Sequence, residues 1–298
     1  MFYKYGYKTC FVAVIGQPNS GKSSLINSIV QFPVSIVSLK AQTTRDAINA
    51  IYNKDNLQIV FVDTPGFHNK INNLSNSLNF AINSTLEGID LVLFLHPVNE
   101  PIDENTQAFA KKISNIKNKI AIITKTDIED GEFTFEKHSQ KMKEFDFEFD
   151  NILPFSTNFE DLRTNLLSQI EKYAYPSNHF FNNLDVTDQS SRFFAKEIIR
   201  KQILLNVDDE IPHQTAVVID NFDESEKNCI RIDATIYVGR KSHLPIIIGK
   251  AGSVLGQIGT NARKELEEIF GKKVVLKNRV AVAKKWFNDP KMIKKFGY

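Results

Sequence analysis

The chain has 298 residues, a net charge of +2 and a hydrophobic fraction of 42%. This is the composition of a soluble globular protein long enough for two domains, and no apolar run approaches the 18 or so residues of a membrane-spanning helix. The two cysteines, Cys10 and Cys229, lack metal-ligand spacing, so we expect reduced, small hydrophobic residues in an intracellular protein.

The first part of the chain alternates between two kinds of segment. Apolar runs predict buried strands at residues 10–16, 57–63, 90–96, 119–125 and 151–156, and amphipathic segments predict helices at 22–30, 104–117 and 161–174. Such alternation predicts an α/β fold with a mainly parallel sheet, whose ligands gather at the carboxyl ends of the strands.

A first loop between strand and helix, "GQPNSGKSS", fits the pattern G-x-x-x-x-G-K-[ST]. Its backbone N–H groups are expected to surround phosphate oxygens at the positive end of a helix. Lys22 is expected to reach the β- and γ-phosphates, and the Ser23 hydroxyl to bind Mg²⁺. The expected nucleotide-binding residues of this loop are Gly16, Gln17, Pro18, Asn19, Ser20, Gly21, Lys22, Ser23 and Ser24.

The next strand ends in Asp63-Thr64-Pro65-Gly66. Asp63 is predicted to lie near Mg²⁺, and the Gly66 N–H is predicted to sense the γ-phosphate. Between the two landmarks lies "KAQTTRD", from which a hydroxyl must close over the metal. We choose Thr44, with Thr43 as the alternative.

Two later strand ends predict a guanine site. Asp127 can accept hydrogen bonds from guanine N1–H and N2–H₂, which adenine does not offer in that pattern. The Lys125 stem can lie along the base, Thr124 precedes it, and the Ser156 N–H can support guanine O6. Taken in order after four strands, these landmarks predict a GTP-binding domain.

Position 67, where Ras-like proteins carry a water-orienting glutamine, is Phe67. Hydrolysis is therefore expected to be slow or to use another group. Asn19 could help to hold a monovalent cation, K⁺, beside the phosphates, or it could simply brace the loop.

Residues 173–189 break the alternation, and the order after them predicts α-β-β-α-α-β: a helix at 190–206, strands near 215–220 and 229–238, helices flanking 249–252, and a strand near 273–283. We expect a GTP-binding domain over 8–175, a linker over 176–189, a second domain over 190–290 and a tail over 291–298. From residue 239 onward there are 14 Lys and Arg against 4 Asp and Glu, which indicates contact with a polyanion or, alternatively, a solvated lysine-rich surface.

The second loop, Gly249-Lys250-Ala251-Gly252, is a G-x-x-G and has no following hydroxyl for Mg²⁺. In a KH module such a loop clamps a nucleic-acid backbone while bases lie over an apolar groove. We expect RNA binding here, with Arg263 among the contacts.

Together, "GQPNSGKSSLIN", "KAQTTRD", "VDTPGFH", "TKTD" and "IIIGKAGSVLGQIGTNARKELEEIFG" resemble the Era family of bacterial ribosome-assembly GTPases over essentially the whole chain. The resemblance implies a Ras-like P-loop GTPase domain followed by a small α+β type II KH domain. It also implies binding near the 3′ end of 16S ribosomal RNA on the 30S subunit, a cytoplasmic location, and peripheral association with the inner membrane. We expect a monomer.

The chain departs from the family in Thr124, where Asn is usual, in Ala251, where glycine is common, and in the final strand "LKNRVAVAKKW". Two hypotheses follow from the sequence: a GTP-hydrolysing switch in small-subunit maturation, and an RNA-binding protein whose nucleotide is structural.

Overall fold

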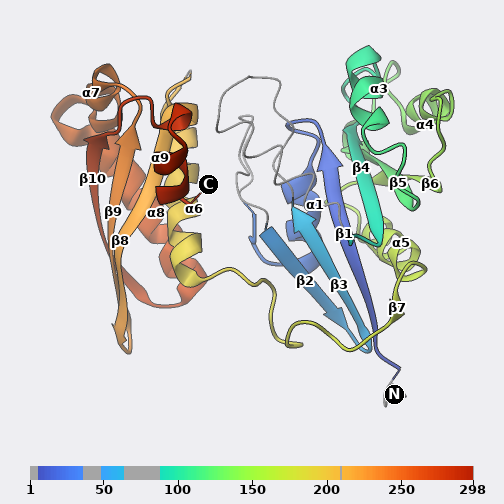
Figure 1. Ribbon diagram of the computed structural model, residues 1–298, viewed down its shortest axis with the longest axis horizontal. Coiled ribbons are helices and arrows are strands. Elements are labelled where there is room, and N and C mark those ends of the chain that lie inside the picture. The colour runs from blue at the N-terminus through green and yellow to red at the C-terminus, as the bar shows by residue number, and fades with distance from the viewer. Residues whose placement is uncertain (1–5, 36–47, 64–87, 209, 298) are drawn as a thin grey trace. The chain divides into compact units, whose positions relative to one another are not determined.

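The computed structural model describes residues 6–35, 48–63, 88–208 and 210–297 (Figure 1). Within these ranges the chain forms two compact units, one ending at residue 188 and the other beginning at residue 189. The expected residues Thr43, Thr44, Thr64, Pro65, Gly66 and Phe67 lie outside the described ranges.

The first unit is built on a sheet with the strand order β2-β3-β1-β4-β5-β6. Neighbouring strands are parallel except for the β2–β3 hairpin, so the mainly parallel sheet is confirmed. A short strand, β7 (Tyr175–Pro176), pairs with the start of β1. The strands are β1 (Lys8–Gly16), β2 (Ile48–Lys54), β3 (Leu57–Asp63), β4 (Leu91–Pro97), β5 (Lys119–Thr124) and β6 (Asn151–Phe155).

Helices pack against the strands of this sheet. The described helices are α1 (Lys22–Val30), α3 (Glu104–Lys111), α4 (Phe135–Lys143) and α5 (Glu160–Glu171). Ala110 of α3 and Met142 of α4 join one buried cluster with Phe94 of β4 and Ile123 of β5. Helix α1 packs on β1, β2 and β3. Strands β1, β4 and β5 are nearly continuous apolar runs because helices bury them.

The stretch expected as a linker is fastened to the first unit. The buried Gln58 amide of β3 accepts from the N–H groups of Phe180 (2.8 Å) and Phe181 (3.1 Å) and donates to the Phe181 carbonyl (3.0 Å). Further along, Ile51 N–H of β2 donates to the Val186 carbonyl at 2.9 Å. The chain between β7 and residue 188 therefore runs along the β2–β3 hairpin rather than away from it.

The second unit confirms the order α-β-β-α-α-β. It contains α6 (Ser191–Asn206), β8 (Thr215–Glu226), β9 (Cys229–Val238), α7 (Leu244–Ile248), α8 (Ser253–Phe270) and β10 (Lys273–Val282). The sheet order is β10-β9-β8, with β8 antiparallel and β10 parallel to β9. Helices α6 and α8 lie side by side against it and share one buried core (Figure 1).

The end of the chain also packs on this unit. Helix α9 (Pro290–Lys295) begins at Asp289, whose carboxylate accepts from the N–H of Lys291 at 2.9 Å. Ile293 and Phe296 are buried, and Phe296 stacks on Tyr237 with ring centroids 4.7 Å apart. Residues 291–297, expected as a tail, thus contribute to the second unit's core.

Candidate functional site

The phosphate loop joins β1 to α1 at the carboxyl edge of the first sheet. A Cβ added at Gly16 would lie 2.3 Å from Ser20 Oγ and 2.7 Å from the Leu95 carbonyl oxygen, so only glycine fits there. Gly21 at φ 89° and Asn19 at φ 64° both adopt left-handed conformations, which glycine and asparagine tolerate best. The loop therefore curls back in front of helix α1.

Lys22, the first residue of α1, is held against this loop. Its Nζ donates to the carbonyls of Gly16 and Gln17, each at 2.9 Å, and the side chain is buried. Burial lowers the pKa of Lys22 to about 8, and the nearby Asp63 carboxylate partly opposes that shift. An ammonium among carbonyl oxygens can be transferred to phosphate oxygens without further desolvation. Pro18 lies within the loop, and Ser24 follows in α1.

A hydroxyl and a carboxylate meet beside Lys22. Ser23 Oγ donates to Asp63 Oδ2 at 3.0 Å, and both residues are buried although 40 positions separate them. Oxygen ligands of this kind, at the end of a phosphate loop, suit Mg²⁺. The donor set fits the ion that the sequence predicts. No group of three or more His, Cys, Asp or Glu side chains that could hold a metal ion occurs among the described residues.

Thr124, at the end of β5, links the base side to the phosphate side. Its Oγ1 donates to the Ser20 carbonyl in the phosphate loop at 2.8 Å, and the residue is 2% exposed. Asn is usual at this position, and here the Thr124 hydroxyl supplies the hydrogen bond to the phosphate loop.

The loops after β5 and β6 meet at the predicted base site. Asp127 Oδ2 accepts from Asn158 Nδ2 at 2.8 Å, and Asn158 N–H in turn donates to Ser156 Oγ at 3.0 Å. Lys125 adopts a left-handed φ of 60°, which turns the chain between Thr124 and Asp127. The structure therefore brings Asp127, Lys125 and Ser156 together. Asn158 could not be predicted as part of the site, because a single loop asparagine carries no pattern.

The G-x-x-G loop of the second unit connects α7 to α8. Gly249, Ala251 and Gly252 all have positive φ, at 75°, 52° and 80°. A Cβ at Gly249 would lie 2.6 Å from Val254 Cγ2 and 2.7 Å from its backbone nitrogen, whereas one at Gly252 would meet nothing. Lys250 is exposed at the loop tip. Arg263 lies further along α8 and forms an ion pair, with its Nη1 2.8 Å from Glu267 Oε2.

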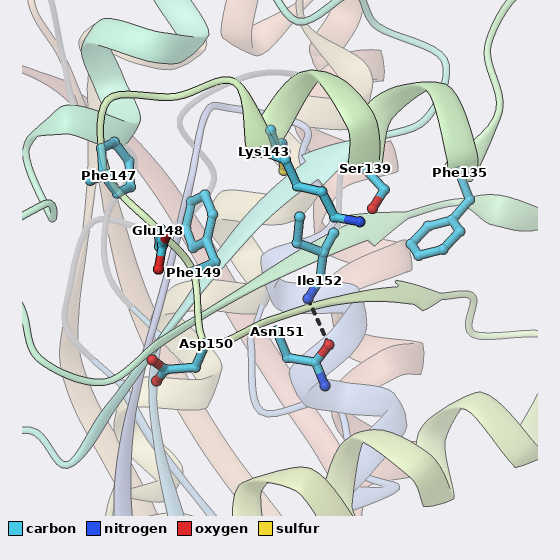
Figure 2. Close-up of a pocket in the computed structure, with 10 residues that line it drawn as sticks. Phe135, Ser139, Lys143, Phe147, Glu148, Phe149, Asp150, Asn151 and Ile152 are labelled. Atoms are coloured by element: carbon cyan, nitrogen blue, oxygen red, sulfur yellow. Dashed lines mark hydrogen bonds between the residues drawn. The ribbon is translucent and has the colours of Figure 1, made fainter.

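A cavity of about 650 Å³ lies elsewhere in the first unit, between α4 and the segment that leads into β6 (Figure 2). Phe135, Phe147, Phe149 and Ile152 give it apolar walls, with Lys143 and Glu148 among its charged lining residues. None of the predicted nucleotide-binding residues lines it.

No helix in the described ranges is both long enough and apolar enough to cross a membrane.

Comparisons with known proteins match both units. A family model described as 50S ribosome-binding GTPase matches residues 11–126, and a KH domain model matches residues 210–287. The chain is 42% identical to GTPase Era of Mycoplasmopsis agalactiae, covering 98% of this chain and 99% of the relative. It is 39% identical to GTPase Era of Mycoplasmopsis pulmonis, covering 97% and 99%.

Two solved structures are similar in fold to this chain, with 98% of this chain and 99% of each of theirs covered and a TM-score of 0.88 in both cases. One is an Aquifex aeolicus Era variant bound to GDP and AlF₄⁻, at 32% identity. The other, at 33% identity, is Era in complex with MgGDPNP and nucleotides 1506–1542 of 16S ribosomal RNA. With a Ras-like P-loop GTPase unit, a C-terminal KH unit and these relatives, the chain belongs to the GTPase Era family.

Proposed function

We propose that the protein is a GTP-hydrolysing switch that binds 16S ribosomal RNA near its 3′ end and acts in assembly of the 30S subunit. The observation that carries the proposal is the pairing, in one chain, of a Lys22–Ser23–Asp63 phosphate site with a separate G-x-x-G unit. The Era structure in complex with 16S ribosomal RNA nucleotides supports the choice of RNA.

In this proposal each group of the first unit has one task. The loop over residues 16–24 binds the phosphates through its N–H groups, and Lys22 neutralises charge on the β- and γ-phosphates. Ser23, Thr44 and Asp63 would hold Mg²⁺, which supplies further charge neutralisation when bound. Gly66 is proposed to sense the γ-phosphate, next to Thr64, Pro65 and Phe67.

Base recognition is assigned to Asp127, with Lys125 along the ring and Ser156 at guanine O6. The Asn158 amide orients the Asp127 carboxylate at 2.8 Å, and a pre-oriented carboxylate loses less conformational freedom when it binds the base. The hydrogen bond from Thr124 to Ser20 fixes the position of the base loop relative to the phosphate loop.

For hydrolysis without a water-orienting glutamine, we propose a K⁺ ion beside the phosphates, held in part by the Asn19 amide oxygen. Asn19 is at φ 64° within the phosphate loop, between Pro18 and Ser20. Replacing Na⁺ by K⁺ at matched ionic strength should raise the hydrolysis rate, and Asn19→Ala should abolish the response. Equal rates in the two salts would remove the ion from the mechanism.

In the second unit, Gly249, Lys250, Ala251 and Gly252 are proposed to clamp the RNA backbone. Arg263, whose side chain is 40% exposed and paired with Glu267 through Nη1, is proposed to contact RNA phosphate as well. We propose domain limits of 8–175, 176–189 and 190–290, with residues 291–297 packed on the last of these. The basic end also suits anionic lipid headgroups, so we propose that the protein associates peripherally with the inner membrane. We also propose that it is a cytoplasmic monomer.

The experiment that tests the proposal is RNA binding by the full chain across a salt series, with the 16S segment 1506–1542 as probe. We expect affinity to fall as salt rises, since phosphate contacts release counterions, and Lys250→Ala to reduce the slope. Lys22→Ala, the matched control in the other unit, should leave RNA affinity unchanged in the absence of nucleotide. Affinity that does not depend on salt would contradict the assignment of the basic end to RNA.

A further inference from the structure

Asn278 occupies an unfavourable position for a polar residue. It lies within β10, the edge strand of the second sheet, and neither its Oδ1 nor its Nδ2 has a hydrogen-bond partner among the described residues, although both atoms are buried. Alternation along the strand places Leu276 and Val280 on the same face, and both pack against the apolar core. Burying an unpaired amide is destabilising, so an apolar residue would suit folding better here.

The amide faces helix α8 at a glycine. A Cβ added at Gly259 would lie 3.3 Å from Asn278 Nδ2, with no other heavy atom within 4 Å. Gly259 is seven residues beyond Gly252 of the G-x-x-G loop, which corresponds to about 10 Å along a helix. Strand β10 contacts both helices that flank the loop, α7 and α8. A few nucleotides of a single strand held at the loop would cover the distance to Asn278.

Between Asn278 and the loop, the same face of β10 offers apolar surface. Val282, on the same face toward the end of β10, is 41% exposed, so a base has an apolar platform on which to lie. Because the Asn278 amide makes no hydrogen bond to the described residues, rotating it away from Gly259 toward the open edge of the sheet breaks none. The residue can therefore change rotamer at small cost when a partner arrives.

We infer that Asn278 is a specificity-determining residue of the RNA site, whose amide hydrogen-bonds to the edge of an unpaired adenine beside the G-x-x-G loop. The inference rests on the proposed RNA binding by this unit. An amide presents one acceptor and two donors, which match the exocyclic N6 amino group and a neighbouring ring nitrogen of adenine. Proteins read single-stranded RNA by such contacts to splayed-out bases.

The test uses the full chain and RNA of the 16S segment 1506–1542, together with a series in which each adenine in turn is replaced by purine riboside. This analogue keeps the ring nitrogens and lacks only the N6 amino group. We expect the parent chain to bind one member of the series about tenfold more weakly than the unmodified RNA. Asn278→Leu should bind that member and the unmodified RNA within about twofold of each other.

Lys277→Ala is the matched control, since its side chain lies on the opposite face of the same strand. It should keep the tenfold discrimination even if it weakens binding to every RNA. Asn278→Leu should also raise the midpoint of thermal unfolding; should it fail to fold, Asn278→Ser serves as the second variant.

The outcomes separate the two claims. The inference is overturned, and RNA binding left intact, if Asn278→Leu and the parent chain show the same ratio of affinities between unmodified RNA and each purine-substituted RNA. A parent chain with equal affinity for the unmodified RNA and every member of the series would also overturn it. Failure of the parent chain to bind the segment at all would overturn the proposed function and the inference with it.

Discussion

Thr124→Val tests whether a hydroxyl at the end of β5 holds the phosphate loop in place. Valine has the same shape as threonine, so the change opens no cavity at this 2% exposed position. It removes the donor that lies 2.8 Å from the Ser20 carbonyl, and within the described part of the chain the only other acceptor of that hydroxyl is the His96 carbonyl at 3.4 Å. Loss of one buried donor costs about 1–3 kcal/mol.

Part of that cost should appear in nucleotide affinity, because the loop must be fixed before its N–H groups can bind phosphate. About 1.4 kcal/mol corresponds to a tenfold weaker GDP complex, and we expect a loss of that order. The rest should lower the free energy of unfolding. Fluorescence titration with labelled GDP and urea denaturation measure the two quantities separately.

Two variants of the same position serve as controls. Thr124→Ser keeps the hydroxyl and loses a methyl group, so it should be less stable yet bind GDP within about twofold of the parent. Thr124→Asn offers an amide donor and should also retain affinity. If Thr124→Val and Thr124→Ser bind GDP equally well, the brace has no role in nucleotide binding and the reasoning is wrong.

Three further predictions concern other contacts. Asn158→Ala releases the Asp127 carboxylate, so GTP affinity should fall about three- to tenfold in titrations while weak ATP binding is unchanged, and an equal fall for both nucleotides would contradict the assignment. Ala251→Gly relieves a left-handed alanine at φ 52° and should stabilise the second unit by about 0.5–1 kcal/mol in denaturant unfolding, whereas a less stable variant would argue against that backbone conformation. Lys22 has a pKa lowered from 10.5 to about 8, so the unfolded chain binds more protons than the folded chain between these values and stability should rise with pH there. Phosphate restores the charge, so calorimetry in buffers of different ionisation enthalpy at pH 8–9 should detect proton uptake on GTP binding, and a binding heat that does not depend on the buffer would contradict the lowered pKa of Lys22.

The elements that the sequence predicted best are helix α1 and the strands that are buried on both faces. Helix α1 spans residues 22–30 as expected, and the apolar runs at 57–63 and 119–125 became β3 and β5 almost residue for residue. Strand β2 was missed because "INAIYNK" mixes polar and apolar residues and is a sheet edge in the described structure. The helix expected over 104–117 ends at Lys111, after which the chain continues in turns.

The contacts that complete the site, and those that hold the segment after β7, could not be predicted from the sequence because they join distant positions. Thr124 and Ser20 are 104 residues apart, and Gln58 lies 123 residues from Phe181, whose backbone it binds. A buried glutamine within a strand gives no sign of which segment it will hold. Spacing within one loop, in contrast, was enough to predict the phosphate site, because a strand, a glycine turn and a helix N-terminus are local features.

Single-turnover hydrolysis of radiolabelled GTP and ATP by the purified chain tests the central claim most directly. We predict that the parent chain binds GTP more tightly than ATP by orders of magnitude and slowly hydrolyses it to GDP and phosphate. Lys22→Ala should neither bind GTP tightly nor hydrolyse it. Equal use of GTP and ATP, or hydrolysis by Lys22→Ala at the parent rate, would contradict a GTPase built on this phosphate loop and the Asp127 base site.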